Sequence, residues 1–228
     1  KSFVFASSCS VYGSEGDEIK NESSTLDPLT PYAKSKVYTE EALAKINSKD
    51  MVITCLRFAT ACGLSDRLRL DLVLNDFVAS AISNDKIEIL SNGKPWRPLI
   101  NVSDMGIALD WAMLRSKDNG GKFLICNTGS NDWNFTVKGL ADNVATCFSN
   151  LEVSVNLNAE PDKRSYQVNF DLFQDLSNNV LPKDDISTTI NKLKDGLLLL
   201  NFKDSNFRQS NFMRLNILNN LINKNILT

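Results

Sequence analysis

Two apolar segments with a helix-forming segment between them constrain the fold of this chain more than any other feature. The segments "SFVFAS" (2–7) and "MVITCLRF" (51–58) are rich in the β-branched and aromatic residues of buried strands. Between them, "LTPYAKSKVYTEEALAKI" (29–46) has the pattern of a helix, with Thr30 as the N-cap and Pro31 in the first turn. This order of elements predicts a parallel α/β sheet with crossover helices.

The later part of the chain continues to alternate between strand and helix patterns. It contains no internal repeat and no low-complexity segment, and it becomes more polar from Pro161 onward. We expect helices at about 71–83, 103–114 and 136–148, strands in "KIEIL" (86–90) and "KFLICN" (122–127), and amphipathic stretches at 186–200 and 211–222.

The composition is that of an ordinary globular protein. A hydrophobic fraction of 43%, a charged fraction of 23% and a net charge of −2 give no electrostatic reason to expect a nucleic-acid or membrane partner. No apolar run approaches the roughly 20 residues that span a bilayer, and the start of the sequence lacks the layout of a signal peptide. The five cysteines are scattered without a CxxC pair, which favours a reducing cytoplasm over a disulfide framework or a thiolate metal site.

The absence of histidine limits the chemistry of the chain. Ser-His-Asp and Cys-His nucleophilic sites and histidine-ligated zinc sites all need this residue. We therefore expect no metal centre, and any general acid or base must be Tyr, Lys, Asp, Glu or Cys.

Tyr32 and Lys36 are four residues apart at the start of the predicted helix, so they lie on one face of it. A lysine there favours the ionised phenol, but a tyrosine normally titrates near pH ~10 and needs about 4 kcal/mol of stabilisation to act as a base near neutrality. A second positive charge, such as an oxidised nicotinamide ring, would have to help. This spacing alone also arises by chance in many helices.

A hydroxyl-rich turn upstream gives the pair a context. "SSCSVYG" (7–13) follows the first strand, and the carboxyl ends of strands are where open α/β sheets bind ligands. Together with "PYAKSK" (31–36), this turn resembles the motifs of the extended short-chain dehydrogenase/reductase family of NAD-dependent nucleotide-sugar epimerases and dehydratases. The resemblance implies that Ser8 and Tyr32 bond the sugar hydroxyl that is oxidised and that Lys36 holds the nicotinamide ribose.

The resemblance also implies a fold and a cofactor. The fold is expected to be α/β, the C-terminal part of a Rossmann-type doubly wound parallel sheet with a smaller mixed α/β substrate-binding lobe. Residues 1–60 would be a partial catalytic region, and residues 61–228 would be the lobe, interleaved with the remaining Rossmann elements at about 100–130 and ending in a helical tail. The implied contacts of NAD, or NADP, are Ala6, Ser7, Tyr32, Lys36, Phe58 and Ala59.

Further segments resemble the substrate-binding parts of the family, with departures. "LRFATACG" (56–63) has Thr60 where asparagine is usual, which puts the predicted substrate contact of Thr60 in question. "RLRLDLVLNDFV" (67–78) places Asn75 where the family contacts the nucleotide diphosphate, through the side chain or the following amides.

Two arginines are the expected diphosphate ligands. "KPWRPLINVSDMGIAL" (94–109) supplies Arg97, whose guanidinium fork suits two phosphate oxygens, although Asn101 replaces the usual histidine of this segment. Asp104 follows as either a first-turn acid of the next helix or a functional residue. "PDKRSYQVNF" (161–170) supplies Arg164, which could equally be part of a surface salt bridge.

Cys9 argues against 4,6-dehydration, because dehydratases of the family carry an acidic residue at this position. The chain also lacks the family's glycine-rich dinucleotide loop and matches only about the C-terminal two-thirds of the family. We therefore expect a fragment of a longer enzyme, or a natural truncation, that does not turn over by itself.

The sequence thus predicts a cytoplasmic, NAD-dependent nucleotide-sugar epimerase-like oxidoreductase that acts on a nucleotide-diphosphate sugar and forms a homodimer. A reductase or dehydrogenase acting on the same substrate is an alternative, because it would differ only in the fate of the oxidised sugar. A non-catalytic nucleotide-sugar-binding or scaffold protein of the same fold is a second alternative. An RNA-binding relative is disfavoured by the sequence pI of about 5.3.

Overall fold

The protein is described by a computed structural model that covers residues 1–13, 18–46, 50–159 and 165–227. Three strands form the central parallel sheet in the order β1 (Ser2–Ser8), β2 (Val52–Phe58) and β6 (Phe123–Thr128). Phe5 lies opposite Cys55, and Cys55 lies opposite Ile125. The parallel pairing confirms the predicted α/β class.

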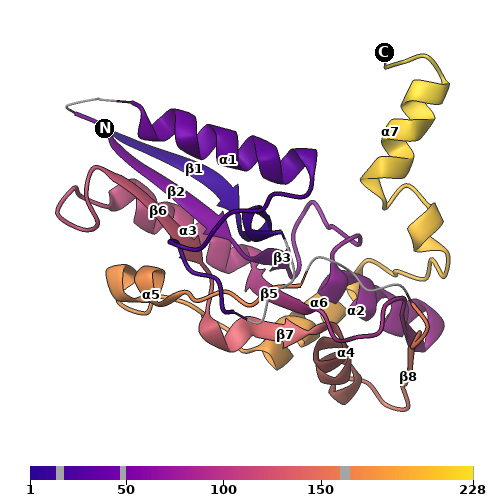
Figure 1. Cartoon of the computed structure of the whole chain (residues 1–228). Helices are drawn as coiled ribbons and strands as arrows, with labels where there is room; N and C mark the ends of the chain where they lie inside the picture. Colours follow the sequence, from indigo (N-terminus) through magenta and orange to yellow (C-terminus); the bar gives the residue numbers. More distant parts are fainter. Residues whose placement is uncertain (14–17, 47–49, 160–164, 228) are drawn as a thin grey trace.

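Two helices flank this sheet. Helix α1 (Pro31–Ala44) runs along one side, and α3 (Val102–Leu114) lies on the other (Figure 1). The start of α1 is as predicted, because the Thr30 side chain accepts a hydrogen bond from the Ala33 amide at 3.1 Å and Pro31 is the first helical residue. The first turn of α1 therefore begins at Pro31.

Two smaller sheets contain strands that the sequence analysis mostly missed. One has the order β3 (Thr60–Cys62), β5 (Trp96–Asn101) and β7 (Asn134–Thr136), and the other pairs β4 (Lys86–Ile89) with β8 (Glu152–Val155). Only β4 was predicted. The others are three to six residues long and pair with distant parts of the chain, so little local pattern identifies them.

The remaining helices surround these small sheets or follow them. Helices α2, α4, α6 and α7 were predicted to within three residues of their observed ends, and the short α5 was not predicted. Their bounds are α2 (Val73–Asn84), α4 (Val137–Thr146), α5 (Asp171–Ser177), α6 (Ile186–Leu199) and α7 (Arg214–Asn223). The apolar faces of α2, α4 and α6 share one hydrophobic core.

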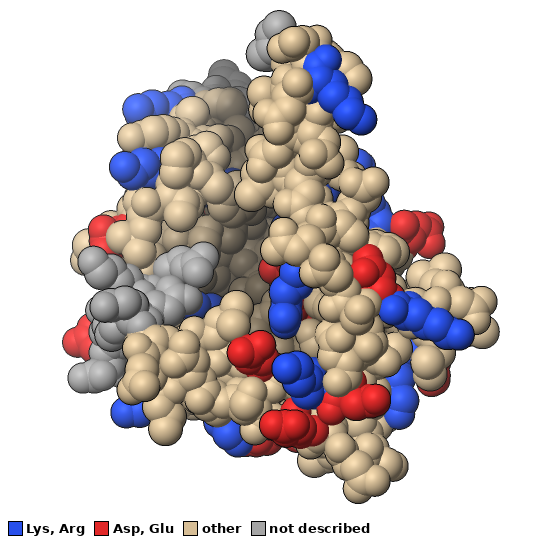
Figure 2. All heavy atoms as spheres, turned by 90° about the vertical axis from the view of Figure 1, so that its right-hand side faces the viewer, with Lys and Arg blue, Asp and Glu red and all other residues tan. Residues whose placement is uncertain are grey.

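The chain continues beyond α6 along the surface of this lobe. Phe202 and Phe207 are buried there and meet edge to face with their ring centroids 5.8 Å apart. Helix α7 then projects away from the body (Figure 1), and the molecular surface beside it is hollowed (Figure 2). Residues 200–213 therefore belong to the folded lobe.

The predicted division of the chain, after Thr60, falls just inside β3, which begins at that residue, and not in the break between β2 and β3. The division itself stays a prediction. Strand β1 is an outer strand of its sheet, and the Phe3 side chain on it is exposed. Within the described residues, each helix is too short or too polar to cross a membrane.

Candidate active site

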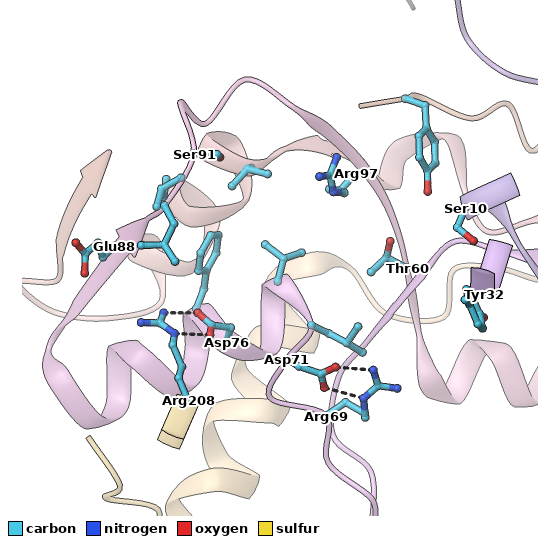
Figure 3. Close-up of a pocket in the computed structure, with 17 residues that line it drawn as sticks. Ser10, Tyr32, Thr60, Arg69, Asp71, Asp76, Glu88, Ser91, Arg97 and Arg208 are labelled. Carbon is cyan, nitrogen blue, oxygen red and sulfur yellow. Dashed lines mark hydrogen bonds and ion pairs between the residues drawn. The ribbon is translucent and has the colours of Figure 1, made fainter. Parts of the chain in front are cut away.

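An elongated pocket of about 750 Å³ lies between the central sheet and the lobe. Ser10, Tyr32 and Thr60 line one end, whereas Asp76 and Arg208 line the other (Figure 3). The volume is in the range of small-molecule sites. The first end contains the predicted site residues Tyr32 and Thr60, whereas Ser8 and Lys36 are not part of the lining. We describe this end first.

Tyr32 is in the first turn of α1 and is 57% exposed. Lys36 follows one turn later, with its Nζ 5.2 Å from the centroid of the Tyr32 ring and 4.9 Å from that of Phe5. The same Nζ donates a hydrogen bond to the Ala6 carbonyl at 2.8 Å. Partial burial lowers the pKa of Lys36. Lys36 thus ties the tyrosine-bearing helix to the end of β1 and places a cation beside the phenol.

Ser8 and Ser10 are in the turn after β1. The Ser8 hydroxyl accepts a hydrogen bond from the Ser10 amide at 3.2 Å and caps a short 3-10 helix, Cys9–Tyr12. Ser10 lines the pocket, and its buried Oγ has no hydrogen-bond partner among the described residues. The sequence analysis assigned roles to Ser7 and Ser8 of this turn but none to Ser10. Ser10 is therefore a second candidate to bond a ligand hydroxyl.

A buried charged network lies behind this end of the pocket. Glu40 and Arg57 are only 2% and 3% exposed and form a two-pronged ion pair, with Arg57 Nη2 2.7 Å and Arg57 Nε 3.0 Å from the carboxylate oxygens. Glu40 also accepts a hydrogen bond from the Ser7 hydroxyl at 2.5 Å. The pair joins α1, β1 and β2 one residue away from Ser8. It fixes the positions of the elements that carry the three motif residues.

The network extends to Tyr12 and Cys9. Arg57 Nη1 donates to the Tyr12 hydroxyl at 3.0 Å, and that hydroxyl donates to Asn127 Oδ1 at 2.7 Å. Burial raises the pKa of Tyr12 despite the nearby Arg57, which favours the protonated phenol. Burial also raises the pKa of Cys9, whose Sγ donates to the Arg57 carbonyl. Cys9 packs in the core.

The predicted cofactor contacts gather at the ends of β1 and β2. Phe58 and Ala59 are buried there. The Ser7 hydroxyl already donates to Glu40, so a cofactor contact of Ser7 would have to come from its backbone. The Lys36 ammonium has three N–H donors, and the hydrogen bond to the Ala6 carbonyl uses one of them. The remaining donors fit the hydroxyl-rich nicotinamide ribose of NAD.

Thr60 and Asn75 have different positions relative to the pocket. Thr60 lines it beside Ser10 (Figure 3). The buried Asn75 side chain instead accepts from the Gly63 amide at 2.9 Å and donates to the Gly63 and Arg69 carbonyls. It closes the loop before α2, so a diphosphate contact from Asn75 itself is not available in this arrangement. The predicted alternative, through the amides that follow, stays a prediction.

Arg97 lines the pocket between its two ends (Figure 3), and its Nη1 donates to the Trp96 carbonyl at 2.8 Å. Arg164 lies outside the described residues. Asn101 caps α3 by accepting a hydrogen bond from the Ser103 amide at 3.1 Å. Asp104 is buried in the first turn of that helix, away from the lining of the pocket, and burial raises its pKa.

Two arginine–aspartate pairs in the pocket were not identified from the sequence. Arg69 contacts Asp71 near Tyr32, with Nε–Oδ1 at 2.7 Å and Nη2–Oδ2 at 2.6 Å. Arg208 contacts Asp76 at the opposite end, with Nε–Oδ2 at 2.7 Å and Nη2–Oδ1 at 2.5 Å. Arg69 and Asp71 are only two residues apart, so a sequence pattern could have indicated the first pair. The second joins residues 132 positions apart, which no sequence pattern shows.

Solved structures confirm the class of fold. The chain superposes on MoeE5 in complex with UDP-glucose and NAD with a TM-score of 0.72 and 22% identity, covering 87% of this chain and 65% of that one. UDP-glucose 4-epimerase from Brucella ovis in complex with NAD superposes with a TM-score of 0.69 and 20% identity, covering 86% of this chain and 65% of that one. dTDP-glucose 4,6-dehydratase from Bacillus anthracis in complex with NAD superposes with a TM-score of 0.71 and 18% identity, covering 86% of this chain and 61% of that one. At these identities the likeness establishes a Rossmann-type fold.

The sequence itself establishes the family. A model of the NAD dependent epimerase/dehydratase family matches residues 1–129, so the chain belongs to this family, as its motifs indicated. A Bacillus subtilis protein described as an uncharacterized UDP-glucose epimerase is 32% identical over 106 residues, which are 46% of this chain and 32% of that protein. The chain thus spans about a third of this relative's length and less than two-thirds of the three solved chains above.

Proposed function

We propose that the protein is an NAD-dependent nucleotide-sugar epimerase-like oxidoreductase, and that this chain supplies its sugar-nucleotide pocket and its proton-transfer residues. The observation that carries the proposal is the position of Tyr32, at one end of the pocket and one helical turn from the Lys36 ammonium. Family membership supplies the cofactor class. The two features together suit oxidation of a sugar hydroxyl.

In the proposed reaction, ionised Tyr32 takes the proton of the sugar hydroxyl. Ser8, and Ser10 beside it, bond the same oxygen and hold it at the phenol. Lys36 stabilises the phenolate through its charge and bonds the nicotinamide ribose with its remaining donors. NAD, held in part by Lys36, would supply the acceptor for the hydride of the carbinol carbon.

The fate of the keto sugar separates the candidate activities. Return of the hydride to the other face of the turned sugar gives epimerisation, with Tyr32 returning the proton to the oxygen. Release of the oxidised sugar gives a dehydrogenase. Cys9 is buried with a raised pKa and offers no acid for loss of a hydroxyl, so we do not propose dehydration.

The proposed substrate is a nucleotide-diphosphate sugar. Its sugar would lie at Tyr32 and Thr60, and Arg97 would clamp the diphosphate between the two ends of the pocket. We keep Arg164 as a second proposed phosphate ligand. The solved complexes of MoeE5 with UDP-glucose and with UDP-glucuronic acid support this class of ligand.

We also propose a homodimer in a reducing compartment. All five cysteines are free thiols, which supports the compartment. Val37 and Leu43 of α1 are buried in the chain's own core, whereas Ala42 and Tyr38 are exposed on that helix and available for a second subunit.

The competing function is a scaffold that keeps the fold without binding NAD. The longer gene product that the sequence predicts should be purified and denatured, and its released small molecules identified by mass spectrometry. Release of NAD supports the enzyme. Absence of a released nucleotide, together with failure of titrated NAD to bind, would overturn the proposed function and leave the scaffold.

A further inference from the structure

The segment after α6 carries an arginine into the wall of the pocket. Arg208 lies in a short 3-10 helix, Phe207–Gln209, and its side chain is at the end of the pocket opposite Tyr32 (Figure 3). The neighbouring Phe207 is only 1% exposed and belongs to the core of the lobe. The backbone that presents Arg208 is therefore anchored in the lobe, and the Asn216 side chain of α7 also donates a hydrogen bond to the Arg208 carbonyl at 3.2 Å.

The Arg208 guanidinium is held in one orientation. Asp76 on α2 accepts two hydrogen bonds from it, at 2.7 and 2.5 Å, and the Ser80 hydroxyl accepts a third at 3.0 Å. The guanidinium carbon lies 5.3 Å from the centroid of the Phe207 ring. These contacts use Nε and Nη2. Nη1 has no hydrogen-bond partner in the described part of the chain, and the side chain is 34% exposed.

The surroundings of Arg208 suit a flat aromatic ring. Phe77 of α2, Ile89 of β4 and Val137 of α4 line the same pocket and are buried. They offer apolar faces, while Arg208 offers hydrogen-bond donors at the margin. With the sugar at Tyr32 and the diphosphate at Arg97, the base of a sugar nucleotide reaches this end.

We propose that Arg208 is a specificity-determining residue that donates a hydrogen bond to a carbonyl oxygen at position 4 of a pyrimidine base. This inference rests on the proposed function, because it takes the ligand to be a sugar nucleotide. Position 4 is the ring position opposite the ribose, so it is the part of the base that reaches furthest into this end of the pocket. A guanidinium only donates hydrogen bonds, so it accepts the carbonyl of uracil or thymine and disfavours the amino group of cytosine.

The expected discrimination is about 10- to 100-fold in Kd, the range for gaining or losing one hydrogen bond to a charged group. UDP and CDP form a matched pair of probes, because their bases differ only in the carbonyl or amino group at position 4 and in the hydrogen that the adjacent N3 carries in uracil but not in cytosine. Isothermal titration of the 228-residue chain with each probe should give the tighter binding for UDP. In the Arg208→Met variant the two Kd values should lie within about 2-fold of each other, chiefly because the binding of UDP becomes weaker.

Arg69→Met is the control, because Arg69 forms the equivalent pair with Asp71 at the other end of the pocket. It should keep the UDP-to-CDP ratio whatever it does to the two affinities. If Arg208→Met does not fold, as judged by circular dichroism, Asp76→Asn replaces it and should reduce the ratio by loosening the guanidinium.

Each outcome decides the inference. Equal affinity of the wild-type chain for UDP and CDP would overturn the role of Arg208 while leaving the nucleotide site of the proposed function intact. An unchanged ratio of the Kd values for CDP and UDP in Arg208→Met would also overturn the role of Arg208. If neither nucleotide binds, the inference and the nucleotide site of the proposed function both fail.

Discussion

The two ends of the pocket are built in different ways. At the Tyr32 end, the hydroxyl-rich turn and the YxxxK helix come from residues close together in the chain, and the buried Glu40–Arg57 pair holds them from behind. At the other end, Asp76 and Arg208 are brought together from 132 positions apart, and their side chains are 18% and 34% exposed. The end proposed for proton transfer is rigidly braced, and the end proposed to recognise the base is partly open to solvent.

This difference suits the demands of the two tasks. Proton transfer depends on distances between a few atoms, so its groups need fixed supports. Recognition of a base needs one or two donors whose identity can change without disturbing the chemistry. The following predictions test the contrast, in order of decreasing effect.

Removing the charge of Glu40 should have the largest effect on stability. Glu40→Gln leaves the buried Arg57 guanidinium without a counter-charge, so we expect a loss of about 3–5 kcal/mol in the free energy of unfolding, measured by urea denaturation. The double variant Glu40→Leu/Arg57→Met should recover most of that loss. A loss below about 1 kcal/mol for Glu40→Gln would show that the pair does not brace this end.

Between the two ends, Arg97→Ala should weaken binding of a nucleotide-diphosphate sugar by about 2–4 kcal/mol, because it removes a charged partner of the phosphates. Isothermal titration of the folded variant measures this. Lys94→Ala is the matched control, since Lys94 is exposed in the same segment and does not line the pocket. Unchanged affinity in Arg97→Ala would remove Arg97 from the phosphate site.

At the open end, Asp76→Asn should cost less than about 1 kcal/mol in the free energy of unfolding, because its pair with Arg208 is partly exposed. Urea denaturation at low and high salt should show the difference from the wild type shrinking as salt rises. A cost as large as that of Glu40→Gln would contradict the contrast between the two ends.

The smallest effect is expected at Glu22, which accepts a hydrogen bond from the Asn127 amide at 2.7 Å. Burial raises the pKa of this carboxyl, so the folded state holds the proton more tightly than the unfolded state. Wild-type stability therefore falls as pH rises from the unfolded value near ~4.3 through the higher folded pKa. Glu22→Gln keeps the acceptor and removes this cost.

Urea denaturation should accordingly find Glu22→Gln more stable than the wild type at neutral pH by a few tenths of a kcal/mol, roughly. The difference should disappear below pH ~4, where the wild-type carboxyl is protonated in both states. A difference that stays constant from pH 3 to pH 7 would mean that titration of Glu22 is not its cause.

The same contrast explains how much could be predicted from the sequence. The cap at Thr30, the first helix and the Tyr32–Lys36 spacing follow from local patterns, and the structure has them as expected. The assignment of Asn75 rested on position in a motif, which does not show that its side chain closes a loop. Arg208 could not be found at all, because tertiary packing alone brings it to the pocket.

The short strands were missed for a related reason. Strand β3 has three residues and pairs with β5, and β7 pairs with β5 in the opposite direction. Such pairings are decided by which distant segments meet, and not by an alternation of apolar and polar residues long enough to recognise. The part of the pocket wall that these strands support could therefore not be predicted from the sequence.

The central claim is that Tyr32 takes the proton from the sugar hydroxyl. The direct measurement is turnover of a nucleotide-diphosphate sugar by Tyr32→Phe in the full-length protein, with bound NAD measured in the same preparation and Tyr38→Phe, on the same helix, as control. We expect turnover to be abolished in Tyr32→Phe, with NAD binding nearly intact and Tyr38→Phe active. Turnover like that of the wild type in Tyr32→Phe would contradict the claim.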